Sequence, residues 1–164
     1  MNKKILIFGG TGAIGFSIAK NLKDQGYNPI IISRNKEDLI SKSNEINCSY
    51  EICDVLESDQ IKEIALKHSE DVIGLAYCVG SINLRPLKIT KDQDFIESFK
   101  VNTLGAINAV KMNLQSLTDN NGSILFFSTI AVQQGFTNHS IVSSSKGAIE
   151  GLTLSLAAEF APKI

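Results

Sequence analysis

Short apolar runs recur along the chain, and each run is nearly continuous instead of alternating with polar residues. The runs are rich in Ile, Val and Phe and cover residues 4–8, 29–33, 49–53, 72–78 and 123–128. Runs of this kind are typical of strands whose two faces are both covered by other parts of the protein. The pattern therefore predicts five buried strands.

Segments with apolar residues three and four positions apart lie between these runs and predict helices. The predicted helices cover residues 14–26, 37–46, 58–69, 92–120 and 143–161. We expect Gly26 to end the first helix and Ser58 to cap the N-terminus of the third. Strands that alternate with helices predict an α/β fold, in which a parallel sheet carries helices on both faces.

Length and composition limit the function classes that need to be considered. The 164 residues suffice for one domain with a buried core, so residues 1–164 are expected to form a single domain. Apolar residues make up 43% of the chain, and the net charge of −1 is spread along it, which argues against a nucleic-acid or basic membrane surface. No apolar run is long enough to span a bilayer, and the first one predicts a strand and not a signal peptide.

The cysteines and histidines give no metal-binding pattern. Cys48, Cys53 and Cys78 are odd in number and lack the spacing of metal ligands, and the two histidines have no cysteine or histidine close to them in the sequence. Free thiols in a reducing compartment are the expected state, which predicts a cytoplasmic protein without a metal site.

A glycine-rich turn, FGGTGAIG at residues 8–15, joins the first strand to the first helix. Glycines let a backbone approach a pyrophosphate closely, and the N-terminus of the following helix offers free N–H groups and a partial positive charge. A tight turn alone would need only one or two glycines. The strand–turn–helix context therefore predicts a dinucleotide site in a Rossmann-type, doubly wound parallel sheet. The residues predicted to contact the cofactor here are Gly9, Gly10, Thr11, Gly12, Ile14 and Gly15.

The end of the second strand bears on which dinucleotide is bound. An acidic residue at this place would hold the ribose 2′-hydroxyl of NAD, but the chain has Ser33 followed by Arg34. A guanidinium pairs well with a phosphate. Ser33 and Arg34 thus favour NADP(H) over NAD(H), although Arg34 as a solvated loop residue is the alternative.

Along its whole length the sequence resembles the short-chain dehydrogenase/reductase family. The glycine turn, Asp54 in ICDV and the asparagine of FKVNTLGA match family motifs, while YCVG at 77–80 replaces an Asn-Asn-Ala-Gly motif and keeps only Gly80. The resemblance implies that Asp54, the following Val55 and Gly80 contact the cofactor. It also implies an oxidoreductase that acts on a carbonyl/alcohol pair.

The family carries an Asn–Ser–Tyr–Lys catalytic set, and the resemblance assigns three of its four positions. Asn102 matches the asparagine, Lys146 in VSSSK matches the lysine, and Thr129 falls at the serine position. A threonine hydroxyl can polarise a carbonyl as a serine does. These residues are the predicted catalytic group, and Lys146 is also expected to bind the cofactor.

The tyrosine position holds Val142, four residues before the lysine and therefore on the same helical face. Valine can neither donate a proton nor hydrogen-bond an alkoxide, and loss of such a donor typically costs ~10²–10⁴ in rate. Hydroxyls that relay a proton from the lysine or from water are one substitute. The sequence offers these substitute donors: Ser143, Ser144, Thr129, His139 and Tyr77.

Three functions therefore remain open. The first is an oxidoreductase with an atypical proton path, and the second is a catalytically inactive dinucleotide-binding sensor or partner subunit. The third is a lyase or isomerase on the same scaffold that produces no net redox change. Fold alone does not choose between them, because function lies in the site.

The resemblance also bears on assembly and chain length. In the family, two long helices form a four-helix interface, which implies a homodimer or homotetramer through residues 92–120 and 142–160. Family members continue with further strands and a segment that covers the substrate. We therefore expect the chain to be the N-terminal part of a family-length protein, with the sheet cut before its last strands and the substrate undefined.

Overall fold

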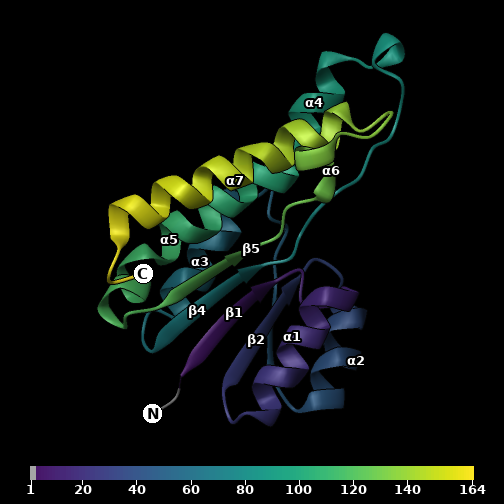
Figure 1. Ribbon diagram of the computed structural model, residues 1–164. Coiled ribbons are helices and arrows are strands. Elements are labelled where there is room, and N and C mark those ends of the chain that lie inside the picture. The colour runs from purple at the N-terminus through teal and green to yellow at the C-terminus, as the bar shows by residue number, and fades with distance from the viewer. Residues whose placement is uncertain (1–2) are drawn as a thin grey trace.

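Five parallel strands form one sheet in the order β3-β2-β1-β4-β5, as the computed structural model of residues 3–164 shows (Figure 1). The strands are β1 (Lys4–Phe8), β2 (Asn28–Ser33), β3 (Ser49–Ile52), β4 (Val72–Tyr77) and β5 (Ser123–Phe126). The order turns back at β1, whose two neighbours are β2 and β4. The predicted Rossmann-type fold is confirmed, with the last three strands ending one or two residues before their predicted ends.

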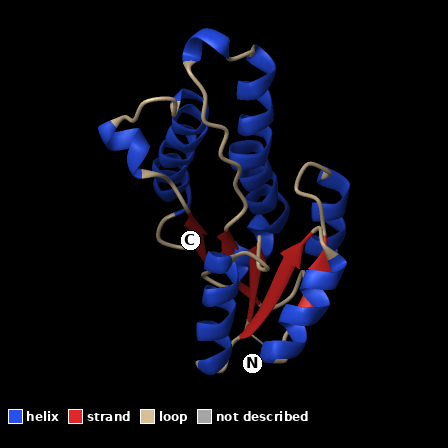
Figure 2. Ribbon diagram, turned by 90° about the vertical axis from the view of Figure 1, so that its right-hand side faces the viewer, coloured by secondary structure: helices blue, strands red, loops and turns tan. Residues whose placement is uncertain are grey.

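Helices cover the sheet on both faces (Figures 1 and 2). One face carries α1 (Ala13–Asp24) and α2 (Lys36–Ile46), and the other carries α3 (Ser58–Lys67), α5 (Gly105–Asp119) and α7 (Ser140–Phe160). Shorter elements lie beyond the carboxyl ends of the strands, and they are η1 (Leu87–Ile89), α4 (Asp92–Phe99), the π-helical η2 (Lys100–Leu104) and α6 (Ile130–Gln134). A ligand cleft is expected beside these ends, at the point where the strand order reverses.

The two faces of the sheet explain the continuous apolar runs of β1, β2 and β4. The prediction of a buried strand is wrong for β3 and β5, which lie at the sheet edges and contain no fully buried residue. In β1, Leu6 and Phe8 belong to the core under α3 and α5, while Ile5 and Ile7 belong to the core under α1. All four are buried. Successive side chains of a strand point to opposite faces, so a strand covered on both faces needs an apolar residue at every position.

Several details of the helices differ from the sequence prediction. Ser58 is not a cap, because Glu57 occupies the N-cap and makes no side-chain hydrogen bond there. The helix predicted over 92–120 is continuous but contains the π turn of η2, and α7 begins three residues earlier than predicted. Gly26 follows α1 with a φ of +84°, a left-handed value that suits the predicted helix end.

Two observations concern the described part of the chain as a whole. Within residues 3–164 no helix combines the length and the apolar character needed to cross a membrane. In the same residues, no three side chains of His, Cys, Asp or Glu gather as metal ligands. Residues 1 and 2, which begin the stretch weighed above as a signal peptide, lie outside the described residues.

Candidate cofactor cleft and active site

The glycine turn is fixed by close contacts with the sheet. Gly9 has a φ of +79°, and a Cβ atom added at Gly10 would lie 2.6 Å from the Cβ of Ile31. A Cβ at Gly15 would collide with the carbonyl oxygen of Gly9. A Cβ added at Gly12, the N-cap of α1, would have only that oxygen near it, at 3.4 Å. Three glycines are thus needed for packing, whereas Gly12 leaves the start of α1 open to a ligand.

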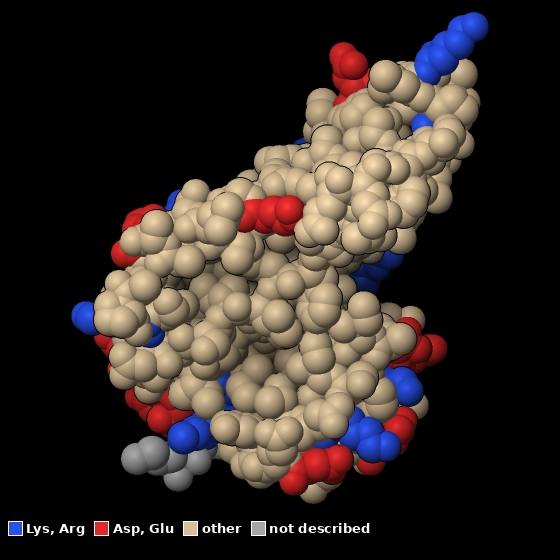
Figure 3. Space-filling view, viewed as in Figure 1, with Lys and Arg blue, Asp and Glu red and all other residues tan. Residues whose placement is uncertain are grey.

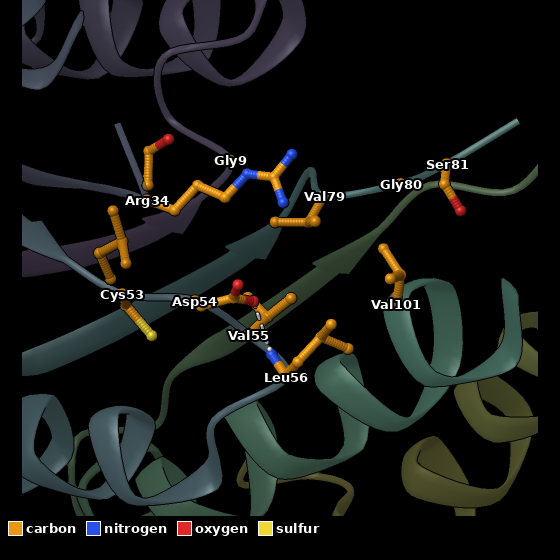
Figure 4. A pocket seen from close by; sticks show the side chains of 12 residues that line it. Gly9, Arg34, Cys53, Asp54, Val55, Leu56, Val79, Gly80, Ser81 and Val101 are labelled. Atoms are coloured by element: carbon orange, nitrogen blue, oxygen red, sulfur yellow. Dashed lines mark hydrogen bonds between the residues drawn. The ribbon is translucent and has the colours of Figure 1, made fainter. Parts of the chain in front are cut away.

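A cleft of about 270 Å³ opens at the carboxyl ends of the strands, beside the glycine turn (Figure 4). Six residues predicted to contact the cofactor line it, and they are Gly9, Ser33, Arg34, Asp54, Val55 and Gly80. The sequence prediction missed six other lining residues, which are Ile32, Cys53, Leu56, Val79, Ser81 and Val101. Five of these six residues are next in sequence to a predicted residue at a strand end, so their place in the sequence could have identified them. Val101 is the exception.

The remaining predicted cofactor residues do not line this cleft. Gly10, Gly12, Ile14 and Gly15 belong to the turn and the first residues of α1, next to Gly9. Thr11 reaches the lining indirectly, because its hydroxyl donates a hydrogen bond to Ser33 Oγ at 3.0 Å. The turn therefore forms one side of the cleft, with Gly9 at its edge.

Cationic and hydroxyl groups gather at the end of β2. Arg34 is exposed, and its guanidinium extends across the cleft towards Val79 (Figure 4). Ser33 and Thr11 hold their hydroxyls together beside it. Asp54 lies across from them after β3, and its carboxylate accepts a hydrogen bond from the backbone N–H of Leu56 at 3.0 Å. A guanidinium with neighbouring hydroxyls is a group that binds phosphate.

Asn102 joins the helices to the loop after β4. It is fully buried in the π turn, and its Nδ2 donates to the carbonyl oxygens of Ser98 at 3.0 Å and Ser81 at 3.2 Å. Its Oδ1 accepts from the N–H of Ser81 at 3.2 Å. The side chain therefore holds the loop beside Gly80 in place.

Lys146 lies next to this loop. Its ammonium donates to the carbonyl oxygen of Phe127 at 2.9 Å, and a Cβ at Gly80 would lie 3.5 Å from Nζ and 3.0 Å from Asn102 Oδ1. The structure thus brings together Asn102, Gly80 and Lys146. Burial lowers the pKa of the Lys146 ammonium, against a smaller opposing effect of Cys78. Burial also raises the pKa of the Cys78 thiol to about 11.

Thr129 and Val142 lie at the positions where the resemblance places the catalytic serine and tyrosine. Thr129 is the N-cap of α6, where its Oγ1 accepts from the N–H of Ala131 at 3.3 Å, so the hydroxyl proton is not used in that bond. Val142 is 3% exposed, one helical turn before Lys146. Position 142 therefore contributes apolar packing and no polar group.

The other substitute donors are all engaged with backbone carbonyls. Ser143 Oγ donates to Ala131 at 3.2 Å and Ser144 Oγ to Ile141 at 2.9 Å. The Nδ1 of His139, the N-cap of α7, lies 2.7 Å from the carbonyl oxygen of Thr137. Tyr77 is 2% exposed, and its hydroxyl donates to the carbonyl oxygen of Val101 at 2.7 Å. Burial raises the pKa of this phenol, which opposes a role as proton donor.

The sequence model of the short chain dehydrogenase family matches residues 3–164. The chain belongs to this family. The match covers both the cleft and the Asn102–Lys146 cluster. The predicted family resemblance is confirmed, and the family is one of oxidoreductases that use a nicotinamide dinucleotide.

Curated relatives of this dehydrogenase-family chain include reductases with different substrates. The 3-oxoacyl-(acyl-carrier-protein) reductase of Mus musculus is 30% identical over 169 residues, which cover 99% of this chain and 71% of the relative. The L-xylulose reductase of Bos taurus is 32% identical over 163 residues, which cover 98% of this chain and 66% of the relative.

Solved structures of the family share the fold. A short chain dehydrogenase/reductase family protein superposes with a TM-score of 0.92 at 24% identity, covering 99% of this chain and 72% of the other. An actinorhodin polyketide ketoreductase solved with NADPH superposes with a TM-score of 0.91 at 21% identity, and the match covers 99% of this chain and 66% of the other. At these identities the likeness establishes the fold alone.

Proposed function

We propose that this chain transfers hydride between NADP(H) and a carbonyl/alcohol substrate, with a proton path that does not use residue 142. The observation that carries the proposal is the cluster of Gly80, Asn102 and Lys146, which adjoins a cleft lined by Gly9 and Arg34. The residues proposed to bind the cofactor and those proposed to react therefore lie at the same edge of the sheet. Relatives named as carbonyl, oxoacyl and xylulose reductases support a carbonyl substrate.

The residues present fit a phosphorylated dinucleotide. The close packing at Gly9, Gly10 and Gly15 leaves no room for side chains at these three positions, and α1 has no acidic residue in its first turn to repel a pyrophosphate. Arg34 and the hydroxyls of Ser33 and Thr11 would hold a 2′-phosphate. When bound, the reduced cofactor supplies the hydride.

Lys146 is the proposed source of the proton in the reductive direction. The carbonyl oxygen takes up one proton as its carbon gains the hydride, and the ammonium gives that proton through a hydroxyl or a water. Thr129 is the relay favoured here, because its hydroxyl proton is not donated within the α6 cap. Solvent then returns a proton to the neutral amine. Burial, which lowers the pKa of Lys146, favours this release.

The buried Val142 favours a second candidate, a dinucleotide-binding sensor or partner subunit without turnover. Such a protein would keep the cleft and need no proton donor. A lyase or isomerase is left without a supporting observation of its own. The free thiols of Cys48, Cys53 and Cys78 favour the proposed cytoplasmic location.

A homodimer or homotetramer through α4, α5 and α7 is part of the proposal. The helices α4 and α7 pack side by side, and apolar side chains on them stay exposed, including Ile96, Phe99 and Leu154. The face over α7 carries few charges, whereas charged residues gather along the lower margin (Figure 3). An interface would bury these apolar groups.

Fluorescence titration with NADPH, followed by NADPH consumption assays with a panel of aldehydes and ketones, tests the proposal. We expect saturable binding and consumption with at least one carbonyl compound. Saturable binding without consumption by any compound would favour the sensor. Absence of saturable binding would contradict both functions.

A further inference from the structure

The π turn η2 changes the hydrogen-bond register of the long helix. At its end, the N–H of Gly105 donates to the carbonyl oxygen of Lys100, five residues earlier. In an α-helix this N–H would donate to the carbonyl oxygen of Val101 instead. The π turn therefore takes the Gly105 N–H away from the Val101 carbonyl, which can accept a hydrogen bond from another donor.

Tyr77 supplies that donor from the sheet. Its hydroxyl, at the end of β4, donates to the Val101 oxygen at 2.7 Å. The tip of the ring occupies the space that a side chain at residue 105 would take, because a Cβ at Gly105 would collide with the Tyr77 hydroxyl. The Tyr77 hydroxyl, the Val101 carbonyl and Gly105 thus fit together where the helix has its π turn.

A second contact holds the next residue of the π turn to the same loop. Asn102 Oδ1 accepts from the N–H of Ser81 at 3.2 Å, and its Nδ2 donates to the Ser81 carbonyl oxygen at 3.2 Å. The loop that begins at Tyr77 and reaches Ser81 is therefore fastened at both ends to two consecutive helical residues. Gly80, which faces Asn102 and Lys146, lies between these fastenings.

We infer that Tyr77 is a positioning residue, whose hydroxyl holds the π turn so that Asn102 and the Gly80 loop keep their places beside Lys146. It acts through the Val101 carbonyl and does not touch the substrate. The importance of this placement for turnover rests on the proposed function. The role of Tyr77 in holding the π turn does not.

The variant Tyr77→Phe removes the hydroxyl and keeps the ring in the core. Tyr27→Phe is the matched control, because Tyr27 packs against the other core, under α1. In the full chain, amide exchange measured by NMR should become about tenfold faster at Leu104 and Gly105 in Tyr77→Phe, as expected for one lost hydrogen bond. It should stay unchanged there in Tyr27→Phe.

Activity gives the second measurement. With an active wild-type protein, Tyr77→Phe should lower kcat about tenfold and leave NADPH affinity within about twofold, because Arg34 and the glycine turn are not disturbed. Equal exchange at residues 104–105 in Tyr77→Phe and wild type would overturn the inference. An inactive wild type with faster exchange in the variant would refute the proposed function and still support the role of Tyr77.

Discussion

The two sides of the cleft differ in how they depend on side chains. On the β1–β2 side, the glycine turn forms its edge through backbone, and Gly10 and Gly15 are fixed by packing. On the β4–α7 side, the geometry depends on Asn102, Lys146 and Tyr77, each held by specific hydrogen bonds. The first side keeps the family pattern, whereas the second has Val142 where the resemblance places a tyrosine.

In the proposed function, cofactor binding and proton transfer therefore depend on different sides of the cleft. Glycine contacts and a helix N-terminus persist as long as the backbone folds, whatever happens in α7. Proton transfer depends instead on the side chains that supply the proton, and Val142 cannot be one of them. Variants on the β1–β2 side should therefore change cofactor affinity, and variants on the β4–α7 side should change turnover.

The largest effect is expected at Val142. Val142→Tyr would add a phenol one helical turn before Lys146, and turnover of a carbonyl substrate should rise by ~10²–10⁴. Steady-state kinetics with NADPH measures the gain. Val142→Phe is the control, since it adds similar bulk without a hydroxyl. Equal behaviour of the two variants would show that the catalytic side has been rebuilt for another purpose.

Lys146 should be needed for turnover and less for folding. Lys146→Met should lower kcat by ~10²–10⁴. Because Lys146 is also expected to bind the cofactor, NADPH titration of the variant separates the loss of turnover from any loss of binding. Because the donor must be protonated, wild-type reduction should slow as pH rises through the lowered pKa of Lys146. In Lys146→Arg this alkaline fall should vanish from the residual activity, since arginine stays charged. The same alkaline fall in both proteins would exclude Lys146 as the proton source.

Arg34 tests the other side of the cleft. Arg34→Glu should weaken NADPH binding by about ten- to a hundredfold, because a charge-assisted hydrogen bond to the phosphate is lost and repulsion replaces it. NADH lacks that phosphate and should lose much less. Fluorescence titration with both cofactors gives the comparison. Equal weakening of the two would mean that Arg34 does not recognise the 2′-phosphate.

The smallest effect is expected on stability. Gly10→Ala should lower the free energy of unfolding by ~1–3 kcal/mol, because the new Cβ would overlap Ile31. Gly151→Ala is the control: no atom lies within 4 Å of its added Cβ, and it should raise stability by ~0.5–1 kcal/mol. Urea unfolding measures both. A neutral Gly10→Ala would contradict the close packing of the turn.

Much of the first side could be predicted from the sequence, because its signals are local. The apolar runs, the glycines and Arg34 lie within a few residues of the elements they define. The β4–α7 side was harder to predict from the sequence. Asn102 and Lys146 were identified through the resemblance, but the donor role of Tyr77 in the π turn depends on a residue distant in sequence.

By itself, the sequence determined the order of strands and helices, the glycine turn and the absence of an ionisable side chain at residue 142. These follow from local periodicity, backbone sterics and residue chemistry. The tertiary structure alone decided the hydrogen-bond register at Gly105, because that register depends on a phenol 28 positions earlier reaching a carbonyl inside the core. The contact between these distant segments is not recorded in any local sequence pattern.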